Sequence, residues 1–415
     1  MKFQGLVSLP TSVSAVLVLL LCLIGVSQTQ VAEPAVGPIP STYFGMHIIF
    51  TTDWPTSSFG ALGKGSSVSW PFVELSRGVY DWSTLDAYVD LAQSHGMSFL
   101  YSQAYVPMWA AKDVNTCSIP YVGGPYTCTS TVANIKDWDD FVNALVKRYK
   151  GRIQIYELWN EPDCNGFTGT VNDMITLTQH EHDDIRANDP SALIASPSAI
   201  SKSYMDSYWS SGGTRDVDIV SLHGYPDVVN NDVPESIGGF KTKPLKDLMN
   251  TYGLQGKLLY DTEASWGNET RSITDPDQQA AFLARHFILH WNYGVTRFYW
   301  YAWDNPTWGT LWSATGGKTK AAKAYDQVYN WLKGATMPSQ CTETGGDGTI
   351  YHGVYACKIT RSGGYTGQIV WNTDGSSTYT AASTYGHYRD LNGKTFTIAS
   401  THKVTIGTKP IILEK

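Results

Sequence analysis

Charged residues are scarce in this sequence, and several familiar motifs are absent from it. Asp, Glu, Lys and Arg make up 16% of the 415 residues, and the net charge is −7. Because no basic stripe is present, nucleic acid is not expected as a partner. No GxSxG sequence occurs, which disfavours a serine esterase. The apolar content of 42% is still enough for a large core and argues against disorder.

The chain also lacks an apolar run of the ~20 residues that a membrane-spanning helix needs. Its longest apolar run, residues 13–26, follows Lys2 and precedes small and polar residues. This arrangement predicts a secretory signal peptide over residues 1–30, with cleavage at 27–32. We therefore expect a secreted protein with no stable membrane insertion after cleavage. A membrane anchor is the alternative.

Cysteine is also rare, and its spacing predicts two disulfides in an exported protein. Cys117 and Cys128 bracket one turn-rich loop, and Cys341 and Cys357 bracket another. Cys164 is left over after these pairs. No histidine that would partner a nucleophilic thiol is evident nearby, so we expect Cys164 to be a buried free thiol. Cys22 would leave with the signal peptide.

Candidate helices alternate with candidate strands along most of the chain. Residues 82–96 open with Ser83 as an expected N-cap and end at Gly96. Residues 137–149 carry apolar side chains at helical spacing. Residues 275–294 begin at Asp275 and Pro276 and stop at a glycine. The eight candidate strands are residues 43–48, 59–64, 98–104, 153–160, 192–197, 218–225, 257–264 and 297–303.

Eight strands with intervening helices predict an α/β fold, a (β/α)8 TIM barrel over residues 40–335. An open doubly wound sheet is the alternative, but no Gly-rich phosphate loop follows the first strand. Residues 341–415 differ from the rest, since they are rich in Thr, Gly, Tyr and Ser and contain short alternating segments. They predict a small C-terminal β-sandwich, which we expect to brace the barrel rather than bind sugar.

Two carboxylic acids stand where barrel strands end, which is where such barrels carry their working residues. Glu161 ends the fourth strand and Glu263 the seventh, each after an apolar segment with aromatic neighbours. Facing each other across the barrel mouth, they would suit glycoside hydrolysis, in which one acid protonates the leaving oxygen and the other attacks or activates water. Glu157 and Asp261 compete with them. Both lie earlier in the same strands, so we expect them to point into the barrel or toward the helices.

No set of metal ligands emerges from the ten histidines. His180 and His182 lie on an expected helix at a spacing that does not suit a shared ion. We therefore expect neither a metal nor another cofactor. One further sequence feature, Asn268 followed by Glu269 and Thr270, is an acceptor for N-glycosylation in a host that glycosylates.

Four stretches carry a family resemblance. "YELWNEPD" (156–163) together with "LLYDTEASWG" (258–267) resembles clan A of the retaining glycoside hydrolases. "VSWPFVELSRGVYDWSTLDAYVDLAQSHGM" (68–97) followed by "VPMWAA" (106–111) is most similar to glycoside hydrolase family 39 and its relatives. That group includes β-xylosidases, iduronidases and exopolysaccharide-cleaving endoglycosidases. The likeness spans residues 43–335 and leaves the sugar open.

The resemblance implies a role for several residues. Glu161 looks like the acid/base, and Glu263 looks like the nucleophile, with carboxyl groups about 5 to 5.5 Å apart. Tyr225 would orient the nucleophile, and Asn160 would hold the sugar's 2-hydroxyl. The remaining substrate-binding candidates are His47, Trp109, His223 and Trp303, the last as the floor under the sugar.

One position departs from the clan pattern. The clan commonly has an arginine at the end of strand two, whereas this chain has Gly63 and Lys64 there. Either Lys64 supplies the cation or none does, and a separate clan A family stays open.

We expect a monomeric, secreted retaining β-glycosidase that acts on a polysaccharide or oligosaccharide, with the 117–128 loop as a wall of its cleft. A catalytically inactive carbohydrate-binding barrel is the alternative, and its only support is Gly63.

Overall fold

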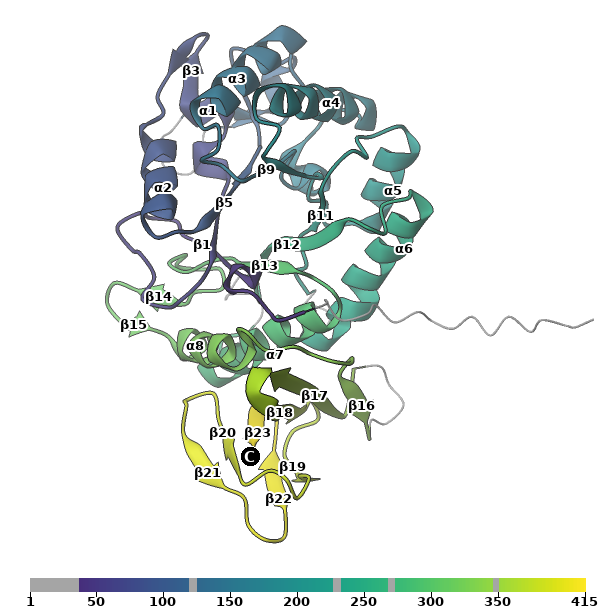
Figure 1. Cartoon of the computed structure of the whole chain (residues 1–415). Coiled ribbons are helices and arrows are strands. Elements are labelled where there is room, and N and C mark those ends of the chain that lie inside the picture. The colour runs from purple at the N-terminus through teal and green to yellow at the C-terminus, as the bar shows by residue number, and fades with distance from the viewer. Residues whose placement is uncertain (1–36, 119–124, 227–232, 268–272, 346–350) are drawn as a thin grey trace, which may run out of the picture. The chain divides into compact units, whose positions relative to one another are not determined.

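The computed structural model describes residues 37–118, 125–226, 233–267, 273–345 and 351–415 (Figure 1). The predicted signal peptide and the sequon at Asn268 lie outside these ranges. None of the helices within them is long and apolar enough to cross a membrane.

Eight parallel strands close into a barrel in the order β1-β13-β12-β11-β10-β9-β5-β2. The predicted (β/α)8 fold is therefore confirmed, and each of the eight predicted strands contains one barrel strand. Figure 1 shows the helices arranged around these strands. The strands are β1 (Phe44–His47), β2 (Ala61–Lys64), β5 (Ser98–Ser102), β9 (Ile155–Glu157), β10 (Leu193–Ala195), β11 (Ile219–Leu222), β12 (Leu258–Ala264) and β13 (Arg297–Trp300).

Most of the described helices begin after a short polar side chain that accepts a hydrogen bond from a free backbone N–H group. Asp275 accepts from the amides of Asp277 and Gln278, as its predicted N-cap role requires. The N-cap predicted at Ser83 is wrong: Trp82 takes the cap position, and Asp81 accepts from the Ser83 amide. The helices are α1 (Trp70–Val73), α2 (Ser83–Ser94), α3 (Ile135–Arg148), α4 (Val171–Asn188), α5 (Lys202–Ser210), α6 (Lys243–Thr251), α7 (Pro276–Asn292) and α8 (Lys320–Leu332).

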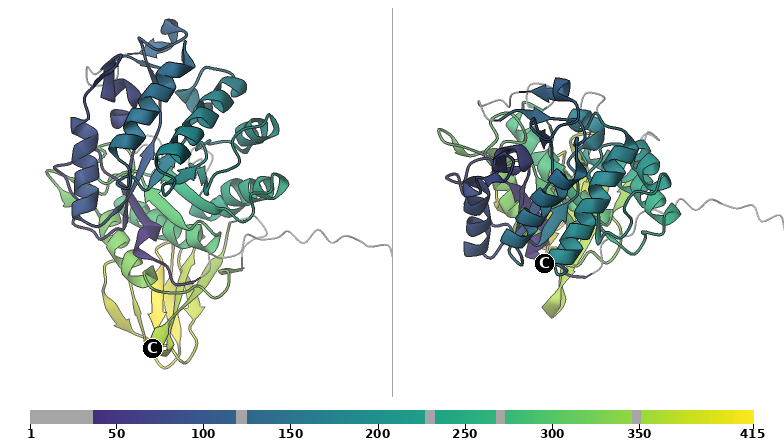
Figure 2. Two further views of the ribbon diagram at one scale, coloured as in Figure 1. Left: turned by 45° about the horizontal axis from the view of Figure 1, so that its top comes forward. Right: turned by 90° about the horizontal axis from the view of Figure 1, so that it is seen from above.

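The C-terminal part is built from two antiparallel sheets, and this confirms the predicted small β-sandwich (Figure 2). Val370, Val404, Ile406 and Leu413 are buried together in one cluster. The six-stranded sheet has the order β16 (Thr342–Thr344), β17 (Val354–Arg361), β18 (Tyr365–Asn372), β23 (Ile411–Glu414), β20 (His387–Arg389) and β21 (Thr395–Thr397), and the other sheet pairs β19 (Ser377–Thr380) with β22 (Lys403–Ile406).

Side chains of the six-stranded sheet join the core of the barrel. Tyr355, Ile359 and Trp371 belong to the same buried cluster as residues of α7 and α8. Helix α7 is buried at every position from 279 to 292, so its polar side chains there must find partners inside the protein. The predicted disulfide Cys341–Cys357 is formed. We propose that residues 341–415 form an accessory domain that braces the barrel of residues 40–335.

A buried ion pair lies at this junction. The Arg285 guanidinium donates from Nη1 to both oxygens of Glu235 at 3.1 Å, and Trp371 donates from Nε1 to Glu235 Oε1 at 2.8 Å. Glu235 is fully buried, and Arg285 is 8% exposed. One carboxylate thus connects α7, the segment before α6 and strand β18.

Glu235→Ala should lower the free energy of unfolding by about 3–5 kcal/mol, because it leaves the Arg285 charge buried without a partner. Denaturant unfolding followed by tryptophan fluorescence would measure this. The matched control is Asp140→Ala, which breaks the exposed Lys136–Asp140 pair and should cost at most about 1 kcal/mol. Equal losses in the two variants would contradict the bracing role.

Candidate active site

The two candidate carboxylates meet at the C-terminal ends of their strands. Glu161 follows β9 in a left-handed conformation, with φ 45° and ψ 59°, and begins a π-helical turn over Pro162–Gly166. Glu263 lies where the register between β12 and β13 shifts, between Asp261 and Ala264. Such an irregularity re-aims a side chain. One oxygen of Glu161 and one of Glu263 lie within 4.8 Å of each other.

His223 lies beside both carboxylates. Its Nδ1 atom is 2.7 Å from Glu161 Oε1, and the side chain is 1% exposed. Burial opposes the charged ring, but the negative charges of Glu263 and Glu161 outweigh burial and raise the pKa of His223 to about 10. The ring is therefore an imidazolium at neutral pH, and Nδ1 donates to Glu161. The sequence predicted only a substrate-binding role for this residue, because its distance to both acids is a tertiary property.

Glu263 is also held by Tyr225, whose hydroxyl donates to Glu263 Oε1 at 2.9 Å. Burial raises the pKa of Glu263 to about 7, although the His223 cation and the Tyr225 hydrogen bond oppose this shift. The negative charge of Glu161 adds to the increase. Near pH 7 the pair of carboxyl groups therefore changes from holding one proton to holding none.

The ring of His47 lies against Gly63 at the end of strand β2. A Cβ atom added at Gly63 would lie 2.8 Å from His47 Cε1, so a larger residue there would require the buried His47 ring to shift. Burial lowers the pKa of His47 to about 3, and the neutral ring donates from Nε2 to the Thr262 carbonyl at 2.8 Å. Gly63 is thus explained by its neighbour in strand β1.

Lys64 is not the missing cation. Its ammonium donates to the carbonyls of Ile48 at 3.1 Å and Ile49 at 3.4 Å. Burial lowers the pKa of Lys64 to about 8, opposed by the Asp304 carboxylate. Lys64 therefore holds the chain that leaves β1, and the cation beside Glu263 is His223.

A cavity of about 200 Å³ opens beside Glu263, and neither Glu161 nor Tyr225 is among its lining residues. Four of the predicted residues line it: His47, Asn160, His223 and Glu263. Lys64, Glu157 and Tyr301 line it as well.

The structure does not bring Trp109 or Trp303 into this lining. The Trp109 indole donates to the Glu74 carbonyl at 3.0 Å and packs edge-on against Trp70. The Trp303 ring is 1% exposed and belongs to the core. The predicted floor residue must be corrected, because the aromatic ring that reaches the cavity from the end of β13 is Tyr301.

Tyr105 and Tyr301 were missed by sequence reasoning. Burial raises the pKa of both hydroxyl groups, and the negative charges of Glu263 and Glu161 add to the increase.

 Both hydroxyl groups therefore stay protonated at neutral pH and can donate hydrogen bonds toward the carboxylates. Tyr105 has a φ of 62°, and this left-handed backbone conformation is uncommon enough in a tyrosine to mark the position. For Tyr301, the sequence offered one indication of a role in the site, which is its place in the aromatic segment that includes Trp303.

The two competing acids point into the barrel and toward a helix, as expected. Glu157 is 1% exposed and accepts at Oε1 from the hydroxyls of Ser102 at 2.7 Å and Ser198 at 2.9 Å, inside the barrel. Asp261 is fully buried and turns toward helix α7, where His290 Nε2 lies 2.6 Å from Asp261 Oδ2. Neither occupies the position between Glu161 and Glu263.

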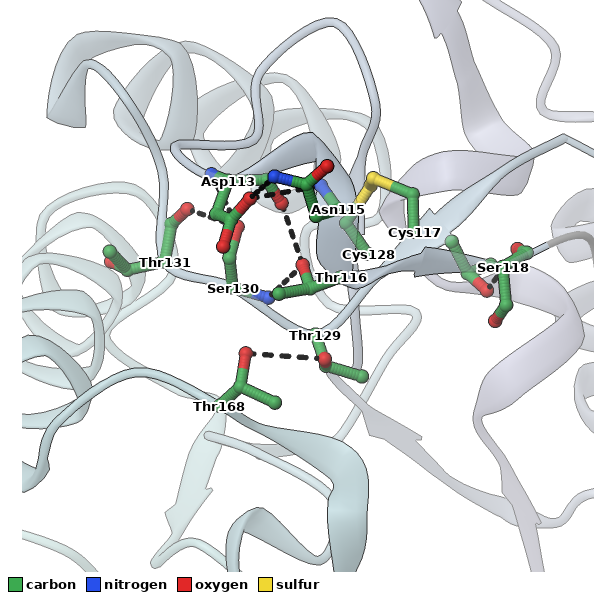
Figure 3. The surroundings of a disulfide bond; sticks show 11 residues. Asp113, Asn115, Thr116, Cys117, Ser118, Cys128, Thr129, Ser130, Thr131 and Thr168 are labelled. Atoms are coloured by element: carbon green, nitrogen blue, oxygen red, sulfur yellow. Dashed lines mark hydrogen bonds between the residues drawn. A yellow bond between two sulfur atoms is a disulfide. The ribbon is translucent and has the colours of Figure 1, made fainter.

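The predicted disulfide Cys117–Cys128 is formed beside the chain that follows Glu161 (Figure 3). Thr168 donates its amide to the Thr129 carbonyl at 2.8 Å, and the hydroxyls of these two threonines are 3.3 Å apart. The disulfide loop thus supports the segment after Glu161. Residues 119–124 lie outside the described ranges, so the cleft wall stays a prediction. Three short strands form the local sheet: β6 (Val106–Pro107), β8 (Thr127–Cys128) and β7 (Cys117–Ser118).

Cys164 is free, as predicted, but the prediction that it is buried is wrong. It is exposed, because the turn after Glu161 directs it outward. Partial burial and the nearby carboxylates of Glu161 and Asp163 raise the pKa of the Cys164 thiol, so the thiolate is disfavoured at neutral pH.

Two groups of described residues have ligand atoms close enough together to hold a metal ion. They are Glu161, His223 and Glu263, and the buried group Asp261, His286 and His290. In each group a short hydrogen bond already joins a histidine nitrogen to a carboxylate oxygen, at 2.7 Å and 2.6 Å. The second of these hydrogen bonds does not include His286.

The family model for glycosyl hydrolases family 39 matches residues 73–301. A family 39 glycoside hydrolase from Bacteroides cellulosilyticus WH2 is similar in structure, with a TM-score of 0.69 and 17% identity over 90% of this chain and 81% of that one. A GH39 β-xylosidase from Caulobacter crescentus has a TM-score of 0.61 and 16% identity over 93% and 98% of the two chains. For a GH30 endoxylanase from Clostridium papyrosolvens C71 the values are 0.60 and 11%, over 92% and 97%.

The pKa of Glu263 should rise above its value of about 7 in Tyr225→Phe, because the lost hydrogen bond stabilises the charged carboxylate. Carbon-13 NMR titration of the glutamate carboxyl carbons would measure it, with Glu263→Gln to assign the signal. Tyr301→Phe is the matched control, because it removes a nearby hydroxyl with no hydrogen bond to Glu263. Equal shifts in both variants would contradict the assigned hydrogen bond.

Proposed function

The chain belongs to glycosyl hydrolases family 39, and from this premise we propose that it cleaves β-glycosidic bonds of a polysaccharide or oligosaccharide with retention of configuration. The observation that carries the proposal is the approach of Glu161 and Glu263, whose nearest oxygens lie within 4.8 Å. Inverting enzymes keep their carboxyl groups about 6.5–9.5 Å apart to admit a water molecule, whereas retaining enzymes keep them at about 5–5.5 Å.

In the first step Glu161 donates a proton to the leaving oxygen while Glu263 attacks the anomeric carbon and forms a glycosyl ester. Burial favours the proton on Glu263 in the free site, so substrate binding has to shift it to Glu161. The Tyr225 hydroxyl and the His223 cation both stabilise the charged form of Glu263, and they therefore favour this shift.

In the second step Glu161 acts as the base that takes a proton from water, and water releases the sugar from Glu263. One negative charge thus moves from Glu263 to Glu161 and back during a turnover. His223 lies beside both carboxylates and carries one positive charge. The net charge of the three groups stays at zero throughout, which avoids an unpaired charge in a buried site.

The inactive-barrel alternative is less favoured than a catalytic role. It depended on Gly63, and the ring of His47 explains that glycine. His223 provides a cation beside Glu263 in place of the arginine. No other observation favours a binding protein without activity.

The cellular setting is part of the same proposal. Two disulfides support a secreted protein, since such bonds persist in oxidising compartments. A monomeric β-xylosidase from Caulobacter crescentus, 15% identical with a TM-score of 0.60, supports a monomer and makes β-xylosides a first substrate to test.

The variants Glu161→Ala and Glu263→Ala should fail in different ways. With an activated aryl β-glycoside, which needs little acid help, Glu161→Ala should form the glycosyl-enzyme and stall, and azide should rescue it as the β-glycosyl azide. Glu263→Ala should lose the first step, and azide should give the α-glycosyl azide. Stopped-flow absorbance and NMR of the products would read both outcomes.

A swapped pattern of azide products would exchange the two roles. Cleavage of the aryl glycoside in both variants without azide incorporation would overturn the two-carboxylate mechanism.

The value of kcat/KM should fall as the pH rises through about 7, because the pair of carboxyl groups then loses the proton that the leaving oxygen requires. A substrate with a poor leaving group should show this fall most clearly, and an activated aryl glycoside should show it least. Rates measured from pH 4 to 10 would test the contrast. Identical profiles for the two substrates would contradict an acid-catalysed first step.

A further inference from the structure

We propose that Asp261 and His290 are positioning residues that hold the ends of β11 and β12 together, so that His223, Tyr225 and Glu263 face one another. Neither is among the residues that line the cavity. The kinetic part of this inference rests on the proposed function, whereas its geometric part does not.

Asp261 links the two strands where their ladder stops. The pairing of β11 with β12 ends at Leu222 and Asp261. Beyond it, Asp261 Oδ1 accepts from the amide of Gly224 at 3.2 Å and from the amide of Glu263 at 3.3 Å. Gly224 stands between His223 and Tyr225, so one carboxylate oxygen contacts the backbone of both site-bearing segments.

The other oxygen of Asp261 explains why residue 224 is a glycine. A Cβ atom added at Gly224 would lie 2.1 Å from Asp261 Oδ2. Gly224 is not among the glycines with positive φ, so its backbone does not require glycine. The buried carboxylate takes the space that any side chain would need.

His290 completes the arrangement from helix α7. Its Nδ1 atom lies 2.8 Å from the His286 carbonyl, which can only accept, so Nδ1 carries a proton. The contact of 2.6 Å between His290 Nε2 and Asp261 Oδ2 must then contain one further proton. Because Asp261 Oδ1 accepts two N–H groups, a carboxylate paired with an imidazolium fits all four contacts.

Packing fixes the His290 ring. It stacks on Phe298 of β13 with the ring centroids 4.0 Å apart and an interplanar angle of 6°. The neighbouring His286 ring is 4.3 Å away, and burial lowers its pKa well below the ordinary value, so it stays neutral. Asp261 thus has a rigid partner, and its side chain can hold the strand ends in one position.

Loss of this contact should displace Tyr225 relative to Glu263, and a misplacement of about 1 Å can cost roughly 100-fold in rate. We expect Asp261→Ala to lower kcat by at least ~10-fold, with KM changed by less than ~3-fold. Asp261→Asn should keep kcat within ~3-fold, because its amide can accept from the two backbone N–H groups and donate to a neutral His290. The measurement uses the 4-nitrophenyl β-glycoside that the unmodified protein cleaves fastest.

Gly224→Ala provides an independent test in a double-mutant cycle. Alone it should lower kcat as Asp261→Ala does, because the new methyl group displaces the carboxylate. In the Asp261→Ala background it should add less than ~2-fold, since the clash is gone. Losses that multiply in the double variant would overturn the proposal.

The control Glu235→Gln distinguishes a positioning role of Asp261 from a merely structural one. It changes an equally buried, ion-paired acid that lies away from the cavity. It should lower the melting temperature and leave kcat of the folded fraction unchanged. If Asp261→Ala behaved in the same way, the positioning role would be overturned.

A crystal structure of Asp261→Ala reads the geometry without any activity. A Tyr225–Glu263 hydrogen bond longer than its present 2.9 Å would support the proposal, and an unchanged one would overturn it. If the unmodified protein cleaved no β-glycoside, the proposed function would fail, and this structure would still decide the positioning role.

Discussion

Two carboxylates held within 4.8 Å of each other in a buried site repel strongly unless a positive charge lies beside them. His223 provides that charge, because the negative charges of Glu263 and Glu161 raise the pKa of its ring to about 10. The ends of β9, β11 and β12 must therefore come together with an accuracy that keeps one histidine ring near two acids. Most of the other features of the site serve this requirement. Tyr225 fixes Glu263, the turn at Glu161 presents its carboxylate, and His47 holds the carbonyl of Thr262, the residue before Glu263.

This accuracy depends on burial that extends well beyond the cavity. Helix α7 is covered on all sides, and it carries both His290, which reaches the strand ends, and Arg285, which reaches the C-terminal sheet through Glu235. The same helix thus connects the accessory domain with the catalytic end of the barrel. A charged pair in the core is costly unless all its hydrogen bonds are made. Asp261 and Glu235 therefore restrict how the residues around them can pack.

The barrel and its two acids could be predicted from the sequence because both follow from local patterns. Apolar segments with turn residues between them give the eight strands, and a glutamate directly after such a segment lies at the barrel mouth. Which aromatic side chains point into the cavity and which point into the core could not be predicted in this way. Trp303 and Tyr301 stand two residues apart after β13, and packing alone decides which of them turns into the core. The exposure of Cys164 and the role of Lys64 likewise depend on loop conformations that have no periodic signal.

The contact between His47 and Gly63 has an evolutionary consequence. An arginine at position 63 alone would collide with the histidine ring, since even a Cβ atom there would lie 2.8 Å from it. A smaller residue at position 47 alone would leave a void and release the Thr262 carbonyl from its hydrogen bond. Each single step between this arrangement and one with an arginine is therefore disfavoured. A change at either position should therefore be tolerated best when the other position changes with it.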